Sequence, residues 1–378
     1  MELLQNTALQ QQEAFACEDC SSSAMKQAIA KWFSLYYGTY TQSGQDHCLR
    51  LPYTVVRKLV RAVFAEYGAV SDQEAAAAVA QALPAAEAME LALIGGECYL
   101  KPVYQGRWLW RVVPRLSILI FARDQEGEPT DVGMVERSRL GRQYFTLLER
   151  RRLDAKGCLS IQNRLFRSAS PGSLGREVAL KAHPDYATLP QNYTYPISLG
   201  SVGLVRLKMP MTNCVDGSPE GVSVYAAALP LIEAVAENEH QLRGEFRKGQ
   251  SRLVVSRDML DRGQLADELF VALDESPDAV GITVFAPELR HRAYLERQQA
   301  YLRAIENVIG LKRGLLSEVE AADRTATEIT SSEGEYMTTV LELRRAWEQA
   351  ARKAVALCAA LEQRAAGEVS FLWGDGIL

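Results

Sequence analysis

The chain has 378 residues, of which 48% are hydrophobic and 24% charged, and its formal net charge is −5. This length and apolar content allow a substantial core in two or three structural units and exclude a disordered chain. The acidic balance argues against a tight, stationary grip on nucleic acid, which normally needs a strongly basic face, but it is compatible with a sliding contact.

The sequence gives no sign of a leader or a membrane span. Residues 1–12 have neither a basic nor an apolar region, so we expect no secretory signal. The most apolar stretch, residues 75–95, contains Glu87 and Glu90 and is interrupted by Pro84. The seven scattered cysteines suit a reducing compartment without a disulfide framework. These features predict an intracellular, soluble protein with no membrane contact.

Residues 23–95 are predicted to be helical. The first helix has apolar residues at helical spacing from Ile29 to Tyr36 and ends at Gly38. A second helix has Pro52 just inside its start and Gly68 after its end. A third, rich in alanine, is expected over residues 72–93.

Residues 97–182 change to short alternating runs separated by turn signals. This pattern predicts an antiparallel β meander. The expected strands cover residues 98–104, 108–113, 117–122, 133–138, 143–153 and 158–166. A basic run at residues 149–152 is interpreted as a solvated or intersubunit charge patch, with DNA contact as the minority alternative.

Residues 210–222 form a boundary before a predicted helix. Ser218 and Pro219 are suitable for its N-cap and first turn, and the helix would run toward Gly249. Pro230 should either kink this helix or delay its start to Leu229. Strand patterns at residues 252–255 and 280–285, with mixed character between them, predict a small α/β insertion. A helix rich in charge follows at residues 289–309.

A long helix is predicted over residues 325–366. Thr325 and Glu328 have the spacing of a capping box, which would begin the helix. Beyond it an a/d stripe is interrupted only by Arg344. The stripe consists of Met337, Val340, Arg344, Trp347, Ala351, Ala354, Cys358, Leu361 and Ala365. One face must be buried against other helices, and a coiled-coil dimer is one way to do so.

Catalytic motifs are not found in the sequence. We find no P-loop, dinucleotide-binding, zinc-protease or nucleophile-elbow pattern, and the four histidines are well spread. We therefore expect no enzyme, no cofactor and no metal site. The alternative is a metal-dependent enzyme that uses Cys17, Cys20, His47 and Cys48, of which only the first two have zinc-ligand spacing.

Several segments, in this order, resemble a bacteriophage portal protein of the siphophage type, the head-to-tail connector. Asn213 opens a segment similar to N-x-x-D-x-S-P-x-G-V-S-V-f-A, and Arg324 opens one similar to K/R-T-A-T-E. The others are Trp32 with Tyr36-Tyr37-Gly38, and residues 92–102, 144–149, 161–166 and 174–180. Together they cover residues 24 to about 345, and their order is more specific than any one of them.

The resemblance implies an α+β portal fold. Residues 1–215 would be the wing, with a helical part at 23–95 and a β meander at 97–182. Residues 216–249 and 289–309 would be two stem helices with a clip at 250–288 between them. Residues 310–324 would be the tunnel loop, 325–366 the long wing and channel helix, and 367–378 a truncated crown or tail.

The resemblance also implies a function. Twelve or so copies would form a ring at the unique capsid vertex of the virion, assembled in the bacterial cytoplasm, through which double-stranded DNA is packaged and ejected. Its partners would be itself, the terminase large subunit, the head-to-tail adaptor, the major capsid and scaffold proteins, and DNA. Lys312, Arg313 and Arg324 are the candidates for phosphate contact.

The long helix has two alternatives at this point. In the ring, its intersubunit face would include Met337, Val340, Trp347 and Leu361. In the alternative, residues 337–365 dimerise as the coiled coil of an adaptor protein without a DNA channel.

Overall fold

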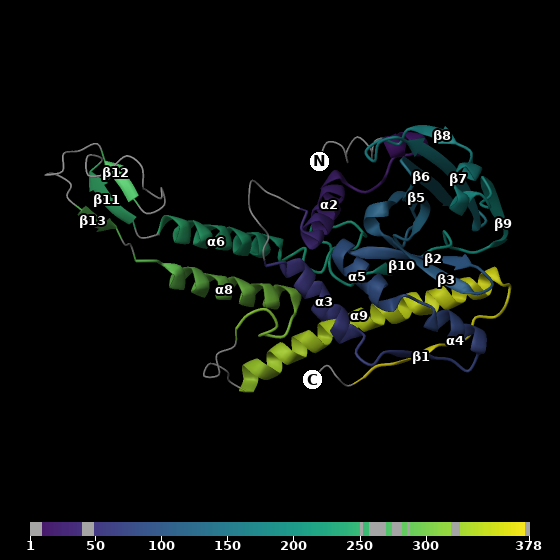
Figure 1. Cartoon of the computed structure of the whole chain (residues 1–378). Helices are drawn as coiled ribbons and strands as arrows, with labels where there is room; N and C mark the ends of the chain where they lie inside the picture. The colour runs from purple at the N-terminus through teal and green to yellow at the C-terminus, as the bar shows by residue number, and fades with distance from the viewer. Residues whose placement is uncertain are drawn as a thin grey trace. The chain divides into compact units, whose positions relative to one another are not determined.

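The computed structural model describes residues 10–39, 49–249, 252–256, 270–273, 282–285, 288–318 and 326–374. Side chains are not described for the three short central strands or for residues 326–332. The chain divides into two compact units (Figure 1). One contains most of the N-terminal 227 residues and the C-terminal part from Gly334, and the other contains Ala228–Glu333 with Thr41–Leu49.

The helical start of the first unit largely follows the prediction. In α2 (Ser23–Tyr37), the Ser22 hydroxyl accepts a hydrogen bond from the Met25 backbone N–H, and Gly38 ends the helix at φ 70°. α3 (Leu51–Val63) has the proline in its first turn. The alanine-rich helix was predicted wrongly as one piece. It is divided into α4 (Glu74–Gln81) and α5 (Ala85–Gly95), because Pro84 lacks the backbone N–H that an unbroken helix needs.

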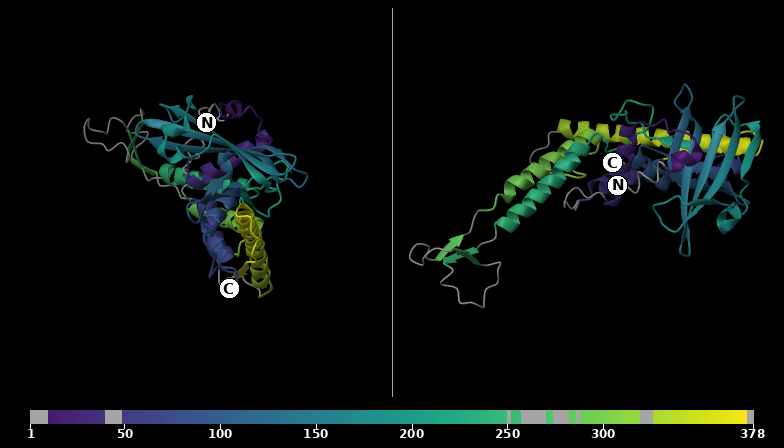
Figure 2. Two further views of the ribbon diagram at one scale, coloured as in Figure 1. Left: turned by 90° about the vertical axis from the view of Figure 1, so that its right-hand side faces the viewer. Right: turned by 90° about the horizontal axis from the view of Figure 1, so that it is seen from above.

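The predicted strands are all present, but they form two sheets instead of one meander. One sheet has the order β10-β2-β3, and the other has the order β4-β5-β6-β7-β8 with β9 also paired to β7 (Figure 2). All pairs are antiparallel. The strands are β2 (Glu97–Tyr104), β3 (Trp108–Pro114), β4 (Ile118–Arg123), β5 (Pro129–Leu140), β6 (Gln143–Leu153), β7 (Cys158–Ser168), β8 (Arg176–Val178), β9 (Asn192–Ser198) and β10 (Val205–Lys208).

Both faces of the larger sheet are covered. Leu147 and Leu148 are neighbours in β6 and therefore point to opposite faces. Leu148 packs in a buried cluster with Phe15, Phe166 and Leu174. Leu147 packs in another with Phe145, Leu165 and Tyr186. This double burial explains why β6 has a continuous apolar centre instead of a strict alternation.

The basic run at residues 149–152 is largely buried, which corrects the solvated part of the prediction, while an intersubunit or DNA contact stays a prediction. Glu149 and Arg151 are buried, and they form an ion pair of 2.6 Å. Lys101 also pairs with Glu149. Arg150 makes two hydrogen bonds to Asp131, of 3.0 and 2.7 Å. The charges of residues 149–151 are therefore neutralised within the sheet, whereas Arg152 is exposed.

The long helix α9 (Ala326–Leu361) buries its apolar stripe within the chain. Five residues of the stripe are 0% exposed: Val340, Trp347, Ala351, Ala354 and Cys358. Trp347 packs edge-on against Phe64, with ring centroids 5.5 Å apart. Intramolecular packing therefore already covers most of the face that a coiled-coil dimer would need.

Arg344, which interrupts the stripe, is buried in a specific place. Its Nε donates a hydrogen bond of 3.1 Å to the carbonyl of Val63, the last residue of α3. Its guanidinium also lies 4.8 Å from the ring centroid of Trp373. A cation at the carbonyl end of a helix is favourable because the last carbonyls have no intrahelical partner.

The segment expected to be a shortened crown or tail contributes to the core fold. β14 (Ser370–Leu372) pairs antiparallel with β1 (Gly68–Val70). Trp373 beside it donates to Glu348 of α9 over 2.8 Å. Among the described residues, no single helix is both long and apolar enough to cross a membrane, and only the bent pair of α4 and α5, at 52°, meets those criteria together.

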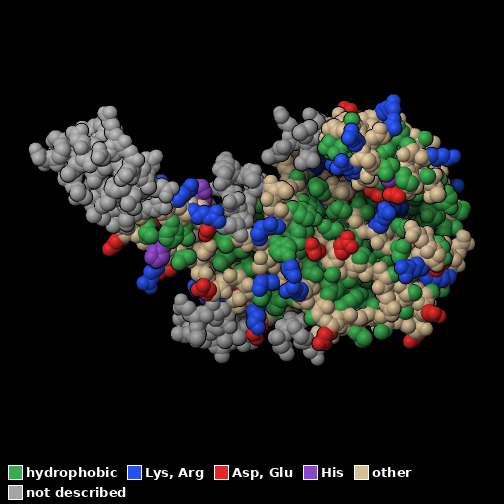
Figure 3. All heavy atoms as spheres, viewed as in Figure 1, with side chains coloured by type: hydrophobic (Ala, Val, Ile, Leu, Met, Phe, Trp, Pro, Cys, Tyr) green, Lys and Arg blue, Asp and Glu red, His purple; other side chains and the backbone are tan. Residues whose placement is uncertain are grey.

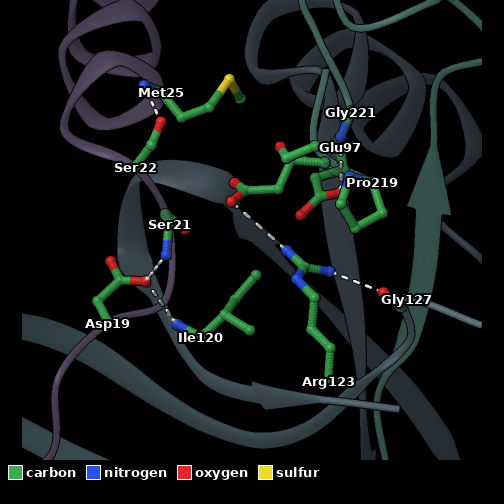
Figure 4. Close-up of polar contacts among 12 residues, drawn as sticks. Asp19, Ser21, Ser22, Met25, Glu97, Ile120, Arg123, Gly127, Pro219 and Gly221 are labelled. Carbon is green, nitrogen blue, oxygen red and sulfur yellow. Dashed lines mark hydrogen bonds and ion pairs between the residues drawn. The ribbon is translucent and has the colours of Figure 1, made fainter. Parts of the chain in front are cut away.

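A buried charge network links the parts of the first unit. Glu97 is 0% exposed and pairs with Arg206 at 2.5 Å and with Arg115 at 3.2 Å. Arg115 also pairs with Glu220 at 2.7 Å. Arg123 lies 3.8 Å from Glu220 and donates 2.8 Å to the carbonyl of Gly127 (Figure 4). They come from the start of β2, the turn before β4, the end of β4, from β10 and from the loop before α6.

Two glycines let the backbone close around this network. A Cβ on Gly96 would lie 2.3 Å from the carbonyl of Gly221, at a φ of +82° that disfavours other residues. The Gly221 N–H donates to Glu97 over 3.2 Å. The two segments can therefore touch only because neither has a side chain there.

The second unit contains a helix pair and a small sheet. α6 (Leu229–Lys248) begins at Leu229, so the longer predicted helix from Ser218 is wrong and the later of the two predicted starts is right. Pro230 occupies the first turn, where its missing N–H has no partner to lose. α8 (His291–Ile309) is its neighbour. β11 (Arg252–Ser256) pairs parallel with β12 (Phe270–Leu273) and antiparallel with β13 (Ile282–Phe285).

We predict that Glu97→Gln lowers the free energy of unfolding by about 3–5 kcal/mol, because buried Arg206 loses its nearest counter-ion and buried Arg115 keeps only Glu220. The control is Glu177→Gln, whose pair with Arg164 is partly exposed and should cost about 0–1 kcal/mol. Urea unfolding followed by circular dichroism measures both. Equal losses in the two variants would contradict the prediction.

We also expect a defined acid sensitivity. Burial alone would raise the pKa of Glu97 above its ordinary 4.5, but Arg206 and Arg115 outweigh it and hold the pKa at about 2. As the pH falls, Glu97 is therefore protonated in the unfolded chain before it is protonated in the folded chain. The stability that this carboxylate contributes is present above pH 4.5 and lost as the pH falls toward 2. Wild-type stability should fall more steeply across this window than that of Glu97→Gln.

Candidate functional site in the loop between α8 and α9

The loop that follows α8 begins with a tight helix end. Gly310 adopts the left-handed conformation, and its N–H donates to the carbonyl of Asn307 over 3.2 Å. The N–H of Leu311 donates to the carbonyl of Glu306 over 2.8 Å. This pair of bonds is a Schellman motif, which needs a residue that tolerates positive φ and therefore favours glycine. Leu311 is then buried, and the chain turns back.

The side chain of Glu306 organises the loop from inside. It is 1% exposed, on the same face of α8 as the buried Leu302, Ile305 and Ile309. One carboxylate oxygen accepts hydrogen bonds from the backbone N–H groups of residues 314, 316 and 317, at 3.1, 2.5 and 2.9 Å. The other accepts from the Ser317 hydroxyl at 2.7 Å. Bonds to a charged acceptor are stronger than neutral ones, so the loop is held in one shape.

A second side chain of α8 holds the end of the described loop. Gln299 accepts a hydrogen bond of 2.8 Å from the backbone N–H of Glu318. Gln299 and Glu306 lie seven residues apart, so they are on one face of the helix, two turns from each other. Residues 310–318 therefore lie along α8 instead of extending from it.

The helix pair that supports the loop is joined by polar contacts. Buried Asn238 of α6 donates to the carbonyl of Tyr294 over 3.0 Å and accepts from Arg297 over 2.6 Å. Glu245 pairs with Arg290 at 2.9 Å. Contacts that advance along α6 move backward along α8, so the helices are antiparallel. A buried amide that needs one partner fixes the register of such a pair.

The predicted phosphate-contact residues are only partly within the described structure. Arg313 is exposed, and Lys312 is half-buried, with its Nζ 2.8 Å from Glu333 of α9. Arg324 and Thr325 lie outside the described residues, and so does the side chain of Glu328. The capping box of Thr325 and Glu328 and the phosphate contact of Arg324 therefore stay predictions.

The predicted intersubunit face of α9 is divided in the structure. Val340 and Trp347 are fully buried by contacts within the chain. Met337 and Leu361 are half-buried. A role of this face between subunits stays a prediction. Met337 and Leu361 keep more accessible surface than Val340 and Trp347.

The loop carries two basic side chains, and no metal-ligand cluster occurs among the described residues. Within the described residues, no three His, Cys, Asp or Glu side chains come together as metal ligands. Of the four proposed zinc ligands, Cys17 and Cys20 are described, whereas His47 and Cys48 fall outside. What the loop presents is two cations on a backbone that a buried carboxylate holds in place.

Sequence reasoning missed Glu306. The available signal was an acidic residue on the apolar stripe of a helix, directly before a segment with glycines at 310 and 314. Such a residue must find hydrogen-bond donors when the stripe is buried, and backbone N–H groups of the next loop are the nearest ones.

We predict that Glu306→Ala frees the loop while α8 stays helical. Amide hydrogen exchange at residues 314, 316 and 317 should accelerate by about tenfold to a hundredfold, since each bond to a charged acceptor contributes about 1.5–3 kcal/mol. Glu296→Ala is the control, because Glu296 is exposed on the same helix and pairs with Arg292. Unchanged exchange in Glu306→Ala would show that the carboxylate does not hold the loop.

The chain shares its fold with a particle-neck protein. No protein-family model matches it, and no curated protein matches it in sequence. Among solved structures it is similar to a chain from the neck of an empty GTA (gene transfer agent) particle computed with C6 symmetry, at a TM-score of 0.50 and 12% identity, over 93% of this chain and 85% of that one. A chain from the neck of a native GTA particle computed with C12 symmetry gives a TM-score of 0.49 and 12% identity, over 92% and 84%. At this identity the likeness is one of fold alone, a mixed architecture of helices and antiparallel sheet.

Proposed function

We propose that this chain is the portal subunit of a phage or prophage particle. In this proposal, copies form a ring at one capsid vertex of the virion, and double-stranded DNA passes through the ring during packaging and ejection. The terminase large subunit, the head-to-tail adaptor, and the capsid and scaffold proteins dock on it, and assembly takes place in the host cytoplasm. The single observation that carries the proposal is the fold likeness to a particle-neck chain over 93% of this chain.

The segment order supports the portal role within such a neck. In sequence, the small sheet lies between α6 and α8, and the held segment 310–318 follows α8 and precedes α9. This is the succession expected for stem, clip, stem, tunnel loop and long helix. The proposal is of a structural component and includes no catalytic step.

The charge of the loop supports a weak contact with DNA. Residues 310–324 contain three basic and three acidic residues, so their net charge is zero. A loop that must let DNA slide needs positioned cations without a large positive field, because each neutralised phosphate adds to the affinity. Glu306 would position Lys312 and Arg313 for brief contacts.

The coiled-coil adaptor is the weaker alternative. It needs the stripe at residues 337–365 to be open for a partner helix. Val340, Trp347 and Ala354 are already 0% exposed in one chain, and Arg344 is bound to α3. Dimerisation through this face would require the first unit to open.

The test of the ring is electron microscopy of the purified chain in negative stain, with light scattering on the same sample at several concentrations. We expect closed rings with a central hole and a mass near twelve chains. A compact monomer or a dimer at every concentration, with and without capsid or scaffold protein, would contradict the portal role.

The test of the loop uses assembled rings and short duplex DNA. Lys312→Ala combined with Arg313→Ala should leave ring formation unchanged and make the salt dependence of DNA binding shallower, because fewer counter-ions are released. Arg139→Ala with Arg142→Ala, which changes two exposed arginines of the sheet, is the control with equal charge loss. An unchanged slope in the loop variant would remove these two residues from the DNA path.

A further inference from the structure

The outer face of α3 is basic throughout. α3 contains Arg57, Lys58 and Arg61 and no Asp or Glu, although the chain has a net charge of −5. Its inner face is apolar and buried, so its cations lie on the outside. Arg57 and Arg61, four residues apart, share one side of α3 and are exposed, and Arg50 at the N-cap is exposed as well. Figure 3 shows Lys and Arg side chains gathered over α3.

Two of these cations are held in position. The guanidiniums of Arg50 and Arg57 lie 5.8 and 5.7 Å from the centroid of the Tyr53 ring. Arg50 also donates to the carbonyl of Tyr36 over 3.2 Å, and Arg57 donates to the Tyr53 hydroxyl. Within the described part of the chain, no carboxylate forms an ion pair with Arg57, Lys58 or Arg61. Cations that are already ordered lose less conformational entropy when a partner binds.

The first half of α9 presents the opposite charge. Residues 326–343 contain four glutamates and no lysine or arginine. Glu335, Thr338 and Glu342 share one side of the helix and are exposed, with exposed Arg345 at the end of that side, while Val340 and Leu343 point inward and are 0% exposed. Leu341 beside them is 41% exposed, which adds an apolar contact to the acidic face.

The two faces are opposite in charge and of similar extent. Glu335 and Glu342 are seven residues apart, about 10.5 Å along α9, whereas Arg57 and Arg61 are four residues apart, about 6 Å along α3, with Arg50 just before that helix. We propose that the basic face of α3 docks on the acidic face of α9 in a second copy of this chain. Within one chain both faces are exposed, so neither neutralises the other.

This docking deepens the proposed function, on which it rests. The two faces differ, so the contact is heterologous: each copy offers α3 to one neighbour and α9 to the other. Such a contact produces a closed ring when the rotation between copies closes, and an open filament when it does not.

The test reverses the charge of each face in turn. The first variant combines Arg57→Glu with Arg61→Glu, and the second combines Glu335→Lys with Glu342→Lys. Each alone sets like charges against each other, so the association constant at low salt should fall by about a hundredfold, the effect of a few kcal/mol. An equimolar mixture should assemble again, because each reversed face then meets a reversed partner. Sedimentation velocity gives the masses, and circular dichroism reports folding.

The control variant combines Arg139→Glu with Arg142→Glu, which carries the same charge change on exposed arginines elsewhere in the unit and should assemble normally. Rings formed by both face variants alone would overturn the docking and leave the portal role intact. Failure of the mixture to assemble would also overturn it. Recovery in the mixture as open filaments or dimers would support the docking and contradict the ring. A wild-type chain that stays monomeric at every concentration contradicts both.

Discussion

The carboxylate of Glu97 imposes the main constraint on the first unit. A buried charge is tolerated only with counter-ions and hydrogen bonds close by, and the chain supplies these from segments that are far apart in sequence. Arg206 comes from β10, Arg115 from the turn before β4, and the Gly221 N–H from the loop that precedes α6. The smaller sheet, the turn before β4 of the larger sheet and the loop before α6 must therefore all meet at the Glu97 carboxylate. Apolar packing alone would not specify their register so narrowly.

The second unit uses a buried carboxylate differently. Glu306 is bound by three backbone N–H groups and one hydroxyl. Glu97 joins elements through cations and fixes a fold, whereas Glu306 gathers successive residues of one segment and fixes a loop. The consequence for function is that residues 310–318 are presented in one conformation. In the proposed portal, a contact made from such a fixed loop could be weak and still recur at the same place in every copy.

The burial of α9 changes what assembly can use. Its apolar stripe is taken up by contacts in its own chain, and Arg344 binds the carbonyl end of α3 there. What the helix leaves for other copies is its polar side. Association through polar faces is sensitive to salt and reversible, whereas exposed apolar faces would promote aggregation of the free subunit. In the proposed ring, this distribution would keep free subunits apart until assembly begins.

The sequence alone determined the local structure. Alternation predicted the strands from β2 to β7, and proline and glycine marked the ends of α2 and α3, because these signals act over a few residues. The order of segments also suggested the resemblance to a portal protein, and the comparison with solved structures shows a fold shared with a particle-neck chain. Only the tertiary structure decided that the meander splits into two sheets, that Arg344 and Arg151 are buried, and that Glu306 holds the loop. A heptad stripe has the same sequence pattern whether it packs against another chain or within its own. The sequence around a charged residue likewise does not show whether distant residues supply its counter-ions. Those outcomes depend on contacts between residues distant in sequence, which no local pattern contains.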